Sequence, residues 1–280
     1  NRFERVYGIM NGTCNYILSK MEDTGEDFAD VLAEAQDLGY AEADPSFDVG
    51  GIDTAHKLAI LASLAYGTHV DFGKVFIEGI ERVGAIDIQF ARELGYRIKL
   101  LGMARRTSHG IEQRVHPCMV PLGSPISEVS GVTNAVVAVG NYCGEVMFEG
   151  PGAGAGPTAS AVIADIVDIA RNLILPPFAA PSSVLERAPA SPMQLHEGAY
   201  YVRLTVVDQP GVMAGITAIM AQHSVSIDSI IQRARKPGAG VPVVMVTHDT
   251  QEAQMNRVLS ALAAMKPVIE QPVMIRIEKI

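Results

Sequence analysis

Hydrophobic positions recur every three or four residues through residues 1–70, which predicts helices. The shared apolar faces of the first two helices are formed by Ile17, Leu18 and Met21, and by Phe28, Val31, Leu32 and Ala35. Gly39 follows as a stop signal, and Asp53–Ala65 has the alanine- and leucine-rich side of a third helix. Pro45–Gly51 is rich in turn formers and predicts a loop. We expect this region to be helical apart from its loops.

Residues 71–150 change to short, β-prone stretches that are separated by Gly and Pro. The predicted strands are Arg97–Ala104, Gln113–Val120, Ala135–Val139 and Glu145–Glu149. A sheet with helices on one side is the natural arrangement. A helix over residues 157–172 follows, and its apolar stripe predicts a buried face made of Val162, Ile163, Ile166 and Ile169.

The last third of the chain has a second pattern. Residues 173–197 are rich in proline, which predicts a linker. Residues 198–280 then alternate between strand and helix periodicity, with a hairpin loop predicted over residues 236–240. The predicted order is Tyr200–Val207, a Val212–Met220 stripe, Val225–Gln232, Val241–His248, a Met255–Leu262 stripe and Val268–Ile277. This is the ferredoxin-like βαββαβ order, so we predict an α+β protein with units at 1–172 and 198–280.

Composition narrows the choice of partners. A chain of 280 residues favours two domains. The net charge of −9 argues against nucleic acid or an anionic membrane as the main partner. No apolar run reaches the roughly 18 residues of a membrane span. Cys14, Cys118 and Cys143 are odd in number and lack metal-binding spacing, so we expect reduced thiols, a cytoplasmic location and no metal.

The richest candidate chemistry lies in Gly39–Lys57, which we call the acidic segment. Asp53 and Lys57 are four residues apart and share a helix face, so the carboxylate can hold the ammonium and tune it for proton transfer. Glu42 and Asp48 could recognise a substrate ammonium. An ordinary exposed Asp–Lys helix pair and a solvated loop explain the same residues, and both alternatives stay open.

Two glycine-containing turns precede helices. Gly12-Thr13 opens the first helix, where Thr13 most simply acts as an N-cap and the free amides could also hold a carboxylate. Gly150–Thr158 contains the spacing G-x-G-x-x-A, but it lacks the βαβ context of a dinucleotide-binding domain. We therefore expect only a glycine loop that lies close to a ligand.

Other polar residues give weaker signals. The histidines at 56, 109, 116 and 196 have no metal-ligand spacing and are expected to be structural or exposed. Lys99 lies within an apolar strand and could face a site, but a surface position at a strand end is the simpler expectation.

Three segments resemble the C-terminal two thirds of the homoserine dehydrogenase family. They are GIMNGTCNYIL at Gly8–Leu18, GYAEADPSFDVGGIDTAHKLAIL at Gly39–Leu61, and GPGAGAGPTASAVIADI at Gly150–Ile166. The last 80 or so residues resemble an ACT domain, which begins with DQPGVMAGI at Asp208–Ile216. The family interconverts homoserine and aspartate semialdehyde with NAD or NADP, in threonine, methionine and isoleucine biosynthesis.

The resemblance implies a role for each matching residue. Lys57 would exchange a proton with the substrate oxygen, and Asp53 would position that lysine. Glu42 would bind the substrate amino group. Tyr40, Asp48, Gly12 and Thr13 would line the pocket, and Gly152 and Gly154 would approach the nicotinamide cofactor. Residues 150–172 would return to the nucleotide-binding domain.

The resemblance also implies what lies outside this chain and how the enzyme is regulated. The family's nucleotide-binding domain, with a second lysine and a metal site, precedes the position equivalent to Asn1, so we expect a truncated chain that is inactive alone. ACT domains pair edge to edge and bind amino acids, which makes threonine the expected effector and a homodimer or homotetramer the expected assembly. The candidate effector contacts are Gln209, Gly211, Val212, Ser226 and Asp228. The alternatives are a unit that only dimerises, and a non-catalytic amino-acid-binding regulatory fragment.

Overall fold

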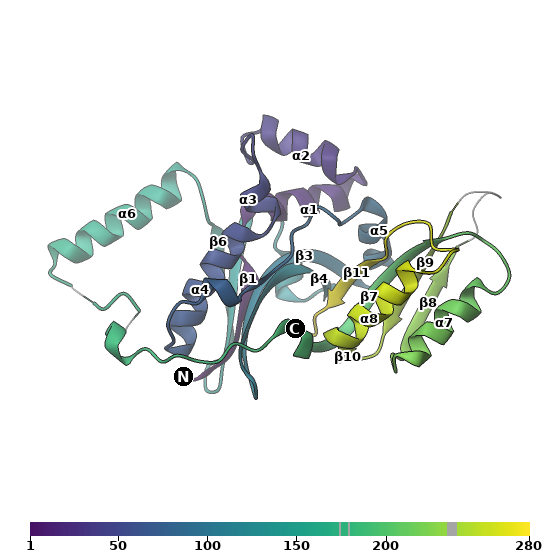
Figure 1. The fold of residues 1–280 in the computed structure, drawn as a ribbon. Coiled ribbons are helices and arrows are strands. Elements are labelled where there is room, and N and C mark those ends of the chain that lie inside the picture. Colours follow the sequence, from purple (N-terminus) through teal and green to yellow (C-terminus); the bar gives the residue numbers. More distant parts are fainter. Residues whose placement is uncertain (174, 179, 234–239) are drawn as a thin grey trace.

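The computed structural model describes residues 1–173, 175–178, 180–233 and 240–280, and it confirms an α+β fold. One sheet runs through the molecule in the strand order β6-β5-β1-β3-β4-β11-β7-β9-β8, with β2 attached to β4 and β10 to β7 (Figure 1). Its N-terminal strands are β1 (Phe3–Ile9), β2 (Phe76–Ile77), β3 (Tyr96–Thr107), β4 (Gly110–Pro121), β5 (Thr133–Gly140) and β6 (Gly144–Pro151). We call β1 to α6 the N-terminal unit and β7 to β11 the C-terminal unit.

Helices of the N-terminal unit cover one face of its sheet (Figure 1). They are α1 (Gly12–Thr24), α2 (Phe28–Asp37), α3 (Ser46–Val49), α4 (Ile52–Tyr66) and α5 (Ala85–Glu93). Each of α1, α4 and α5 contacts β3, and the buried faces predicted for α1 and α2 pack in this layer. The opposite face of the sheet carries a second apolar cluster around Tyr7, Leu101 and Val137.

The expectation of a helical N-terminus is wrong for the first element. Residues Phe3–Ile9 form β1, a central strand that pairs with both β3 and β5. Because a central strand is buried on both faces, its apolar residues do not alternate, and periodicity over so short a run does not separate strand from helix. The predicted Pro45–Gly51 loop likewise contains the one-turn helix α3.

The C-terminal unit confirms the predicted βαββαβ order. It consists of β7 (Glu197–Val206), α7 (Val212–Gln222), β8 (Ile227–Gln232), β9 (Val241–Thr247), β10 (Thr250–Gln251), α8 (Glu252–Ala263) and β11 (Val273–Ile277). Helices α7 and α8 pack on one face of its sheet through the residues around Ile216 and Leu262. The hairpin loop predicted at 236–240 lies, except for Gly240, outside the described residues.

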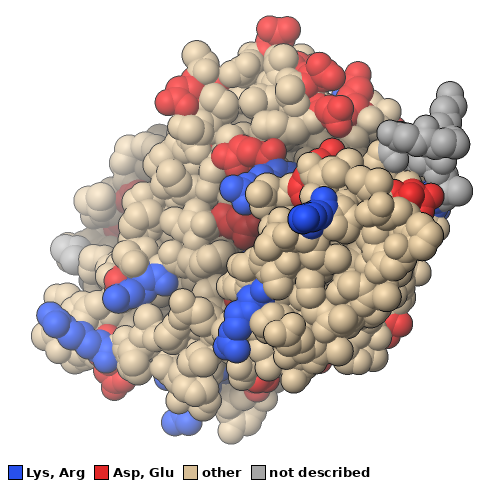
Figure 2. All heavy atoms as spheres, turned by 45° about the vertical axis from the view of Figure 1, so that its right-hand side comes forward, with Lys and Arg blue, Asp and Glu red and all other residues tan. Residues whose placement is uncertain are grey.

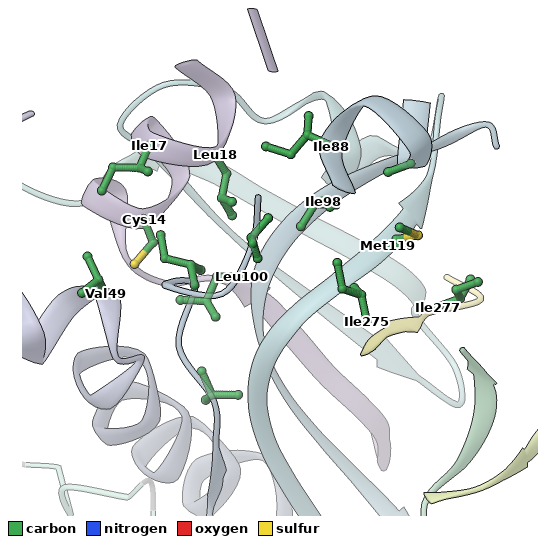
Figure 3. Close-up of a cluster of buried hydrophobic side chains, with 14 of the residues drawn as sticks. Cys14, Ile17, Leu18, Val49, Ile88, Ile98, Leu100, Met119, Ile275 and Ile277 are labelled. Carbon is green, nitrogen blue, oxygen red and sulfur yellow. The ribbon is translucent and has the colours of Figure 1, made fainter. Parts of the chain in front are cut away.

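The two units share a core. Strand β11 pairs parallel with β4 through Arg276 and Ile277. The face of the C-terminal sheet that α7 and α8 leave uncovered, including Tyr201 and Ile275, belongs to the apolar cluster of the N-terminal unit. Figure 3 shows Ile275 and Ile277 on β11 beside Met119, in the same cluster as the side chains of α1. Residues distant in sequence are therefore held together by both backbone pairing and apolar packing.

Helix α6 (Ala155–Ala170) contradicts the buried face predicted for it. None of its residues is buried, and the predicted core residues Val162, Ile163, Ile166 and Ile169 are 51%, 56%, 53% and 71% exposed. The helix stands away from the sheet (Figure 1). An amphipathic pattern shows that a helix has an apolar face to cover, but it does not show that the same stretch of chain covers it.

The segment between the units follows the surface of the N-terminal unit. Glu186 and Ala190 form single β-bridges with Thr68 and Ile111. Its ordered turns are short 3₁₀ helices at Ser182–Val184 and Met193–Leu195. In the described part of the chain, no helix has both the length and the apolar character required to cross a membrane.

Candidate functional site

The candidate site forms where the N-terminus of α1 meets the acidic segment. Asn11 precedes α1, and its side-chain Oδ1 accepts a hydrogen bond from the Cys14 amide at 2.8 Å, which caps the helix. Its Nδ2 donates to Asp48 Oδ1 at 2.7 Å and to Asp53 Oδ2 at 2.9 Å. One amide thus caps a helix and draws two carboxylates together.

Lys57 of α4 completes this group, and we call Asn11, Asp48, Asp53 and Lys57 the Lys57 cluster. The Lys57 Nζ donates to Asp53 Oδ2 at 2.7 Å and to the backbone oxygen of Met10 at 3.0 Å. An ammonium has three protons, so one remains for a ligand, and the side chain is 49% exposed. The predicted i, i+4 pair is therefore present, and it is built into a larger cluster of polar groups.

The buried thiol of Cys14 lies among several carboxylates, and their negative charge affects its pKa. Cys14 is fully buried, and its Sγ donates to the backbone oxygen of Asp48 at 3.2 Å. Burial raises the pKa of the Cys14 thiol well above its usual value, and the negative charges of Asp48, Glu81 and Asp53 raise it further. A cationic group of a ligand is favoured beside these carboxylates.

Of the other predicted site residues, Thr13 and Tyr40 contact each other or α1, whereas Glu42 is exposed. Thr13 lies inside α1 and donates to the backbone oxygen of Tyr40 at 2.6 Å, so the expectation that Thr13 caps the helix is wrong. The ring of Tyr40 packs against Tyr16 with 4.9 Å between centroids. Glu42 is exposed, and its carboxylate forms no hydrogen bond or ion pair with another described residue.

The glycine loop after β6 approaches the same end of α1. A Cβ placed on Gly12 would lie 3.4 Å from Asn134 Oδ1, and one on Gly152 would lie 2.6 Å from Asn134 Nδ2. Asn134 therefore separates the two turns by the width of one side chain. Gly154, with φ 113°, is the N-cap of α6, whose first turn has no acidic residue. The free amides of that turn can receive an anionic ligand.

Sequence reasoning missed Asn11 and the carbonyl of Met10. Asn11 stood next to the quoted Gly12-Thr13 pair, and asparagine is among the preferred N-cap residues, so the cap itself could have been found. The carbonyl of Met10 had no side-chain signal, because it depends on where β1 ends.

The expectation of a surface position for Lys99 is wrong. Its side chain is 1% exposed, and Nζ donates to Asn15 Oδ1 at 3.1 Å and to Val129 O at 2.5 Å. Burial, aided by the charge of Arg97, lowers the pKa of Lys99 to about 8. The amine therefore links Asn15 of α1 to the backbone at Val129, and it forms no hydrogen bond with the Lys57 cluster.

The remaining predictions concern metal ligands and the effector site. No group of three or more His, Cys, Asp or Glu side chains within the described ranges could hold a metal ion. His116 and His196 are buried. All three cysteines are free thiols. Among the effector candidates, Gly211 is the N-cap of α7, Val212 is buried, and Gln209, Ser226 and Asp228 are exposed.

Negative charge is unevenly distributed over the surface. Figure 2 shows acidic side chains gathered at the top of the molecule, where α2 lies in Figure 1. The exposed acids of α1, α2 and the turn between them are Asp23, Glu26, Asp27, Asp30 and Asp37. Such a surface repels polyanions.

Known proteins match both units. A family described as homoserine dehydrogenase matches residues 1–167, and a family described as ACT domain matches residues 200–266. The homoserine dehydrogenase of Pseudomonas aeruginosa is 45% identical over 287 residues, which cover 100% of this chain and 66% of that protein. The one from Neisseria gonorrhoeae is 43% identical, with the same coverage. This chain therefore spans just under two thirds of the length of these relatives.

Solved structures agree with these matches. A homoserine dehydrogenase from Thiobacillus denitrificans superposes with a TM-score of 0.92 at 45% identity, over 99% of this chain and 64% of that one. A hyperthermophilic archaeal homoserine dehydrogenase in complex with NADPH gives a TM-score of 0.52 at 30% identity, over 61% of this chain and 48% of that one. These matches show that the chain belongs to the homoserine dehydrogenase family and carries a C-terminal ACT domain.

Proposed function

We propose that this chain supplies the substrate half of a homoserine dehydrogenase, which interconverts L-homoserine and L-aspartate 4-semialdehyde. The single observation that carries the proposal is the Lys57 ammonium. It is fixed by Asp53 and Met10 and retains one proton directed to no described residue. A purely structural ion pair on a helix surface would need neither the backbone contact nor the second carboxylate.

The proposed chemistry assigns proton transfer to Lys57. In the oxidation direction its neutral form accepts the proton of the substrate hydroxyl, and in reduction the ammonium returns it. Asp53 holds the amine in place. Asp48, with Glu42 from the exposed part of the acidic segment, would bind the substrate ammonium, and the amides at Gly12-Thr13 would bind its carboxylate beside Tyr40.

The residues present fit a nicotinamide cofactor, NAD or NADP. The Gly152–Gly154 turn lies against Asn134, on the other side of which lies Gly12. A side chain at Gly152 would fill the approach to that turn. Gly152 and Gly154 would hold the cofactor beside the substrate pocket, and its nicotinamide supplies the hydride acceptor when bound. A homologue solved with NADPH supports this choice of cofactor class.

The test of the catalytic proposal is Lys57→Met in a polypeptide that joins this chain to the nucleotide-binding domain that precedes it in the family. Loss of general acid–base catalysis is expected to lower kcat for homoserine oxidation at least 100-fold. Lys20→Met is the matched control, because Lys20 forms a similar exposed pair with Glu34 on α1 and α2. Activity within a few-fold of wild type in Lys57→Met would contradict the proposal and favour a non-catalytic regulatory fragment.

We also propose that the C-terminal unit, residues 198–280, binds threonine and regulates the N-terminal unit, residues 1–172, through the linker and shared sheet. The ACT match supports amino-acid binding, and Gln209, Gly211, Val212, Ser226 and Asp228 are the candidate contacts. Titration calorimetry with threonine, compared with serine, is expected to show saturable binding at or below millimolar concentration. Absence of heat at ten millimolar would exclude threonine.

A cytoplasmic homodimer or homotetramer is the assembly we propose.

A further inference from the structure

Two strands from different units share one edge of β4. Strand β2 pairs parallel with β4 at Arg114 and Val115, and β11 pairs parallel with the same strand at Cys118 and Met119. The end of β2 therefore lies beside β11 along the strand that both contact. This arrangement brings a residue just after β2, Glu78, to a residue of the C-terminal unit.

Arg276 of β11 connects the two units at this position. Its Nη1 donates to Glu78 Oε2 at 2.8 Å, and its Nε donates to Glu252 Oε2 at 3.0 Å. The guanidinium lies over the ring of Phe76 at 5.0 Å from the centroid. Burial opposes the charge, but hydrogen bonding to Glu252 and the charges of both acids outweigh it and raise the pKa of Arg276. We call these residues the Glu78–Arg276–Glu252 triad.

The residues that follow β2 pack against the backbone of the acidic segment. The Ile80 amide donates to Val49 O at 2.9 Å, and a Cβ placed on Gly79 would clash with Val49 O and lie 2.7 Å from Gly50 Cα, so the two backbones are closely packed here. A Cβ on Gly51 would lie 3.4 Å from Glu78 O and 3.1 Å from Val115 Cγ1. Residues 77–80 thus contact the turn that joins Asp48 to Asp53 in the sequence.

This support matters because α4 begins without a side-chain cap. Gly51 is its N-cap, has φ 81° in the left-handed region, and offers no side-chain hydrogen bond. The first turn of α4 carries Asp53, and the preceding α3 carries Asp48. Backbone contacts made by residues 77–80 therefore help to place both carboxylates, together with the hydrogen bonds that Asn11 donates to them.

We infer that Arg276, a residue of the C-terminal unit, is a positioning residue for the substrate pocket and acts through Glu78 on the turn between Asp48 and Asp53. That this turn binds substrate rests on the proposed function; that Arg276 orders it does not. Arg276 contacts neither Lys57 nor Asp53, so its effect is on their placement. The same contact gives the C-terminal unit a direct mechanical connection to the pocket.

The first test measures order in the acidic segment of this chain itself. Amide hydrogen exchange is followed for peptides that cover residues 47–57 in the wild type and in Glu78→Gln, which keeps the shape of the side chain and removes its charge. Exchange is expected to be at least five-fold faster in Glu78→Gln. The matched control is Glu93→Gln, which removes another cross-unit pair, with Arg233, at similar exposure: 30% for Glu93 and 33% for Glu78.

The second test separates positioning from a general structural effect. In the polypeptide that carries the nucleotide-binding domain, Glu78→Gln is expected to raise KM for homoserine five- to twenty-fold with kcat within three-fold. Glu78→Asp, which keeps the carboxylate, is expected to recover part of this loss. Unchanged exchange over residues 47–57 in a folded Glu78→Gln, or a KM equal to that of Glu93→Gln, would overturn the inference.

Two further outcomes keep the inference and the proposed function distinguishable. If the wild type does not oxidise homoserine, the proposed function fails and the exchange experiment still decides on Arg276. If Glu78→Gln does not fold, Arg276→Lys is used in its place, because lysine keeps the charge but cannot reach both acids with a planar fork. Exchange over residues 47–57 equal to the wild type in Arg276→Lys would then overturn the inference.

Discussion

The Lys57 cluster and the Glu78–Arg276–Glu252 triad use the same kinds of side chain in opposite ways. Lys57 is 49% exposed, whereas the side chains of Arg276 and Glu252 are each 3% exposed. Lys57 retains a proton for a ligand, while Arg276 is bound by two carboxylates and an aromatic ring. The cluster at the proposed pocket is exposed and has a free donor, whereas Arg276 and Glu252, both of the C-terminal unit, are buried, and only Glu78 of the triad is about a third exposed.

The difference is between a solvent-exposed charge pair and a buried one. An exposed pair contributes little to stability because water screens it. A buried pair costs desolvation, but once formed it is expensive to break, because one partner is left as a buried charge. The Asp53–Lys57 pair is therefore free to exchange partners with a ligand, whereas the buried Arg276–Glu252 pair is expensive to separate.

The largest expected effect is that of Arg276→Met. Removing the guanidinium leaves Glu252 buried without a counter-ion, so the free energy of unfolding is expected to fall by about 3–5 kcal/mol. Urea denaturation monitored by circular dichroism measures this. Arg5→Met is the control, because Arg5 pairs with Glu145 at 3.6 Å with both side chains more than a third exposed, and it should cost less than about 1 kcal/mol. Equal losses in the two variants would remove the distinction between buried and exposed charge pairs.

The Asp53–Lys57 pair could be predicted from the sequence, because its members are close together in the chain, whereas the triad could not. Asp53 and Lys57 are one helical turn apart, and the strand and helix order of the C-terminal unit followed from period and turn residues. Glu78 and Arg276 are 198 positions apart, and no local pattern indicates that β2 and β11 share an edge of β4. The exposed face of α6 shows the same limit, since periodicity identifies an apolar face and not its partner.

The second largest expected effect concerns Lys99, a buried cation that, unlike Arg276, has no carboxylate partner among the described residues. Lys99 has hydrogen bonds to Asn15 and Val129 but forms no ion pair with another described residue. Its pKa, lowered from 10.5 to about 8 mainly by burial, means that its charge costs up to about 3 kcal/mol in the folded state. In the triad, burial opposes the charge of Arg276 as well, but the two carboxylates outweigh this cost.

The sign of the pH dependence follows from proton binding. Below pH 8 the amine is charged in both states and the full cost is present. Between about 8 and 10.5 the unfolded chain binds more protons, so the contribution of Lys99 to stability rises with pH. The stability of wild type minus that of Lys99→Met is expected to increase by up to about 3 kcal/mol over this range in urea denaturation. A flat or falling difference would show that Lys99 is solvated or paired in solution.

The smallest effect tests the Lys57 cluster itself, through Asn11. Asn11→Ala removes both the cap on α1 and the amide that joins Asp48 to Asp53, and it is expected to cost about 1–2 kcal/mol. Asn11→Ser can restore the cap but not the amide, so it should recover only part of the loss. Asp27→Ala is the control, because Asp27 precedes α2 without a side-chain cap bond and should change stability by less than about 0.5 kcal/mol. If Asn11→Ser matched the wild type, the amide bridge between the two carboxylates would contribute nothing to folding, and their placement would rest on Lys57, the cap and the backbone contacts of residues 77–80.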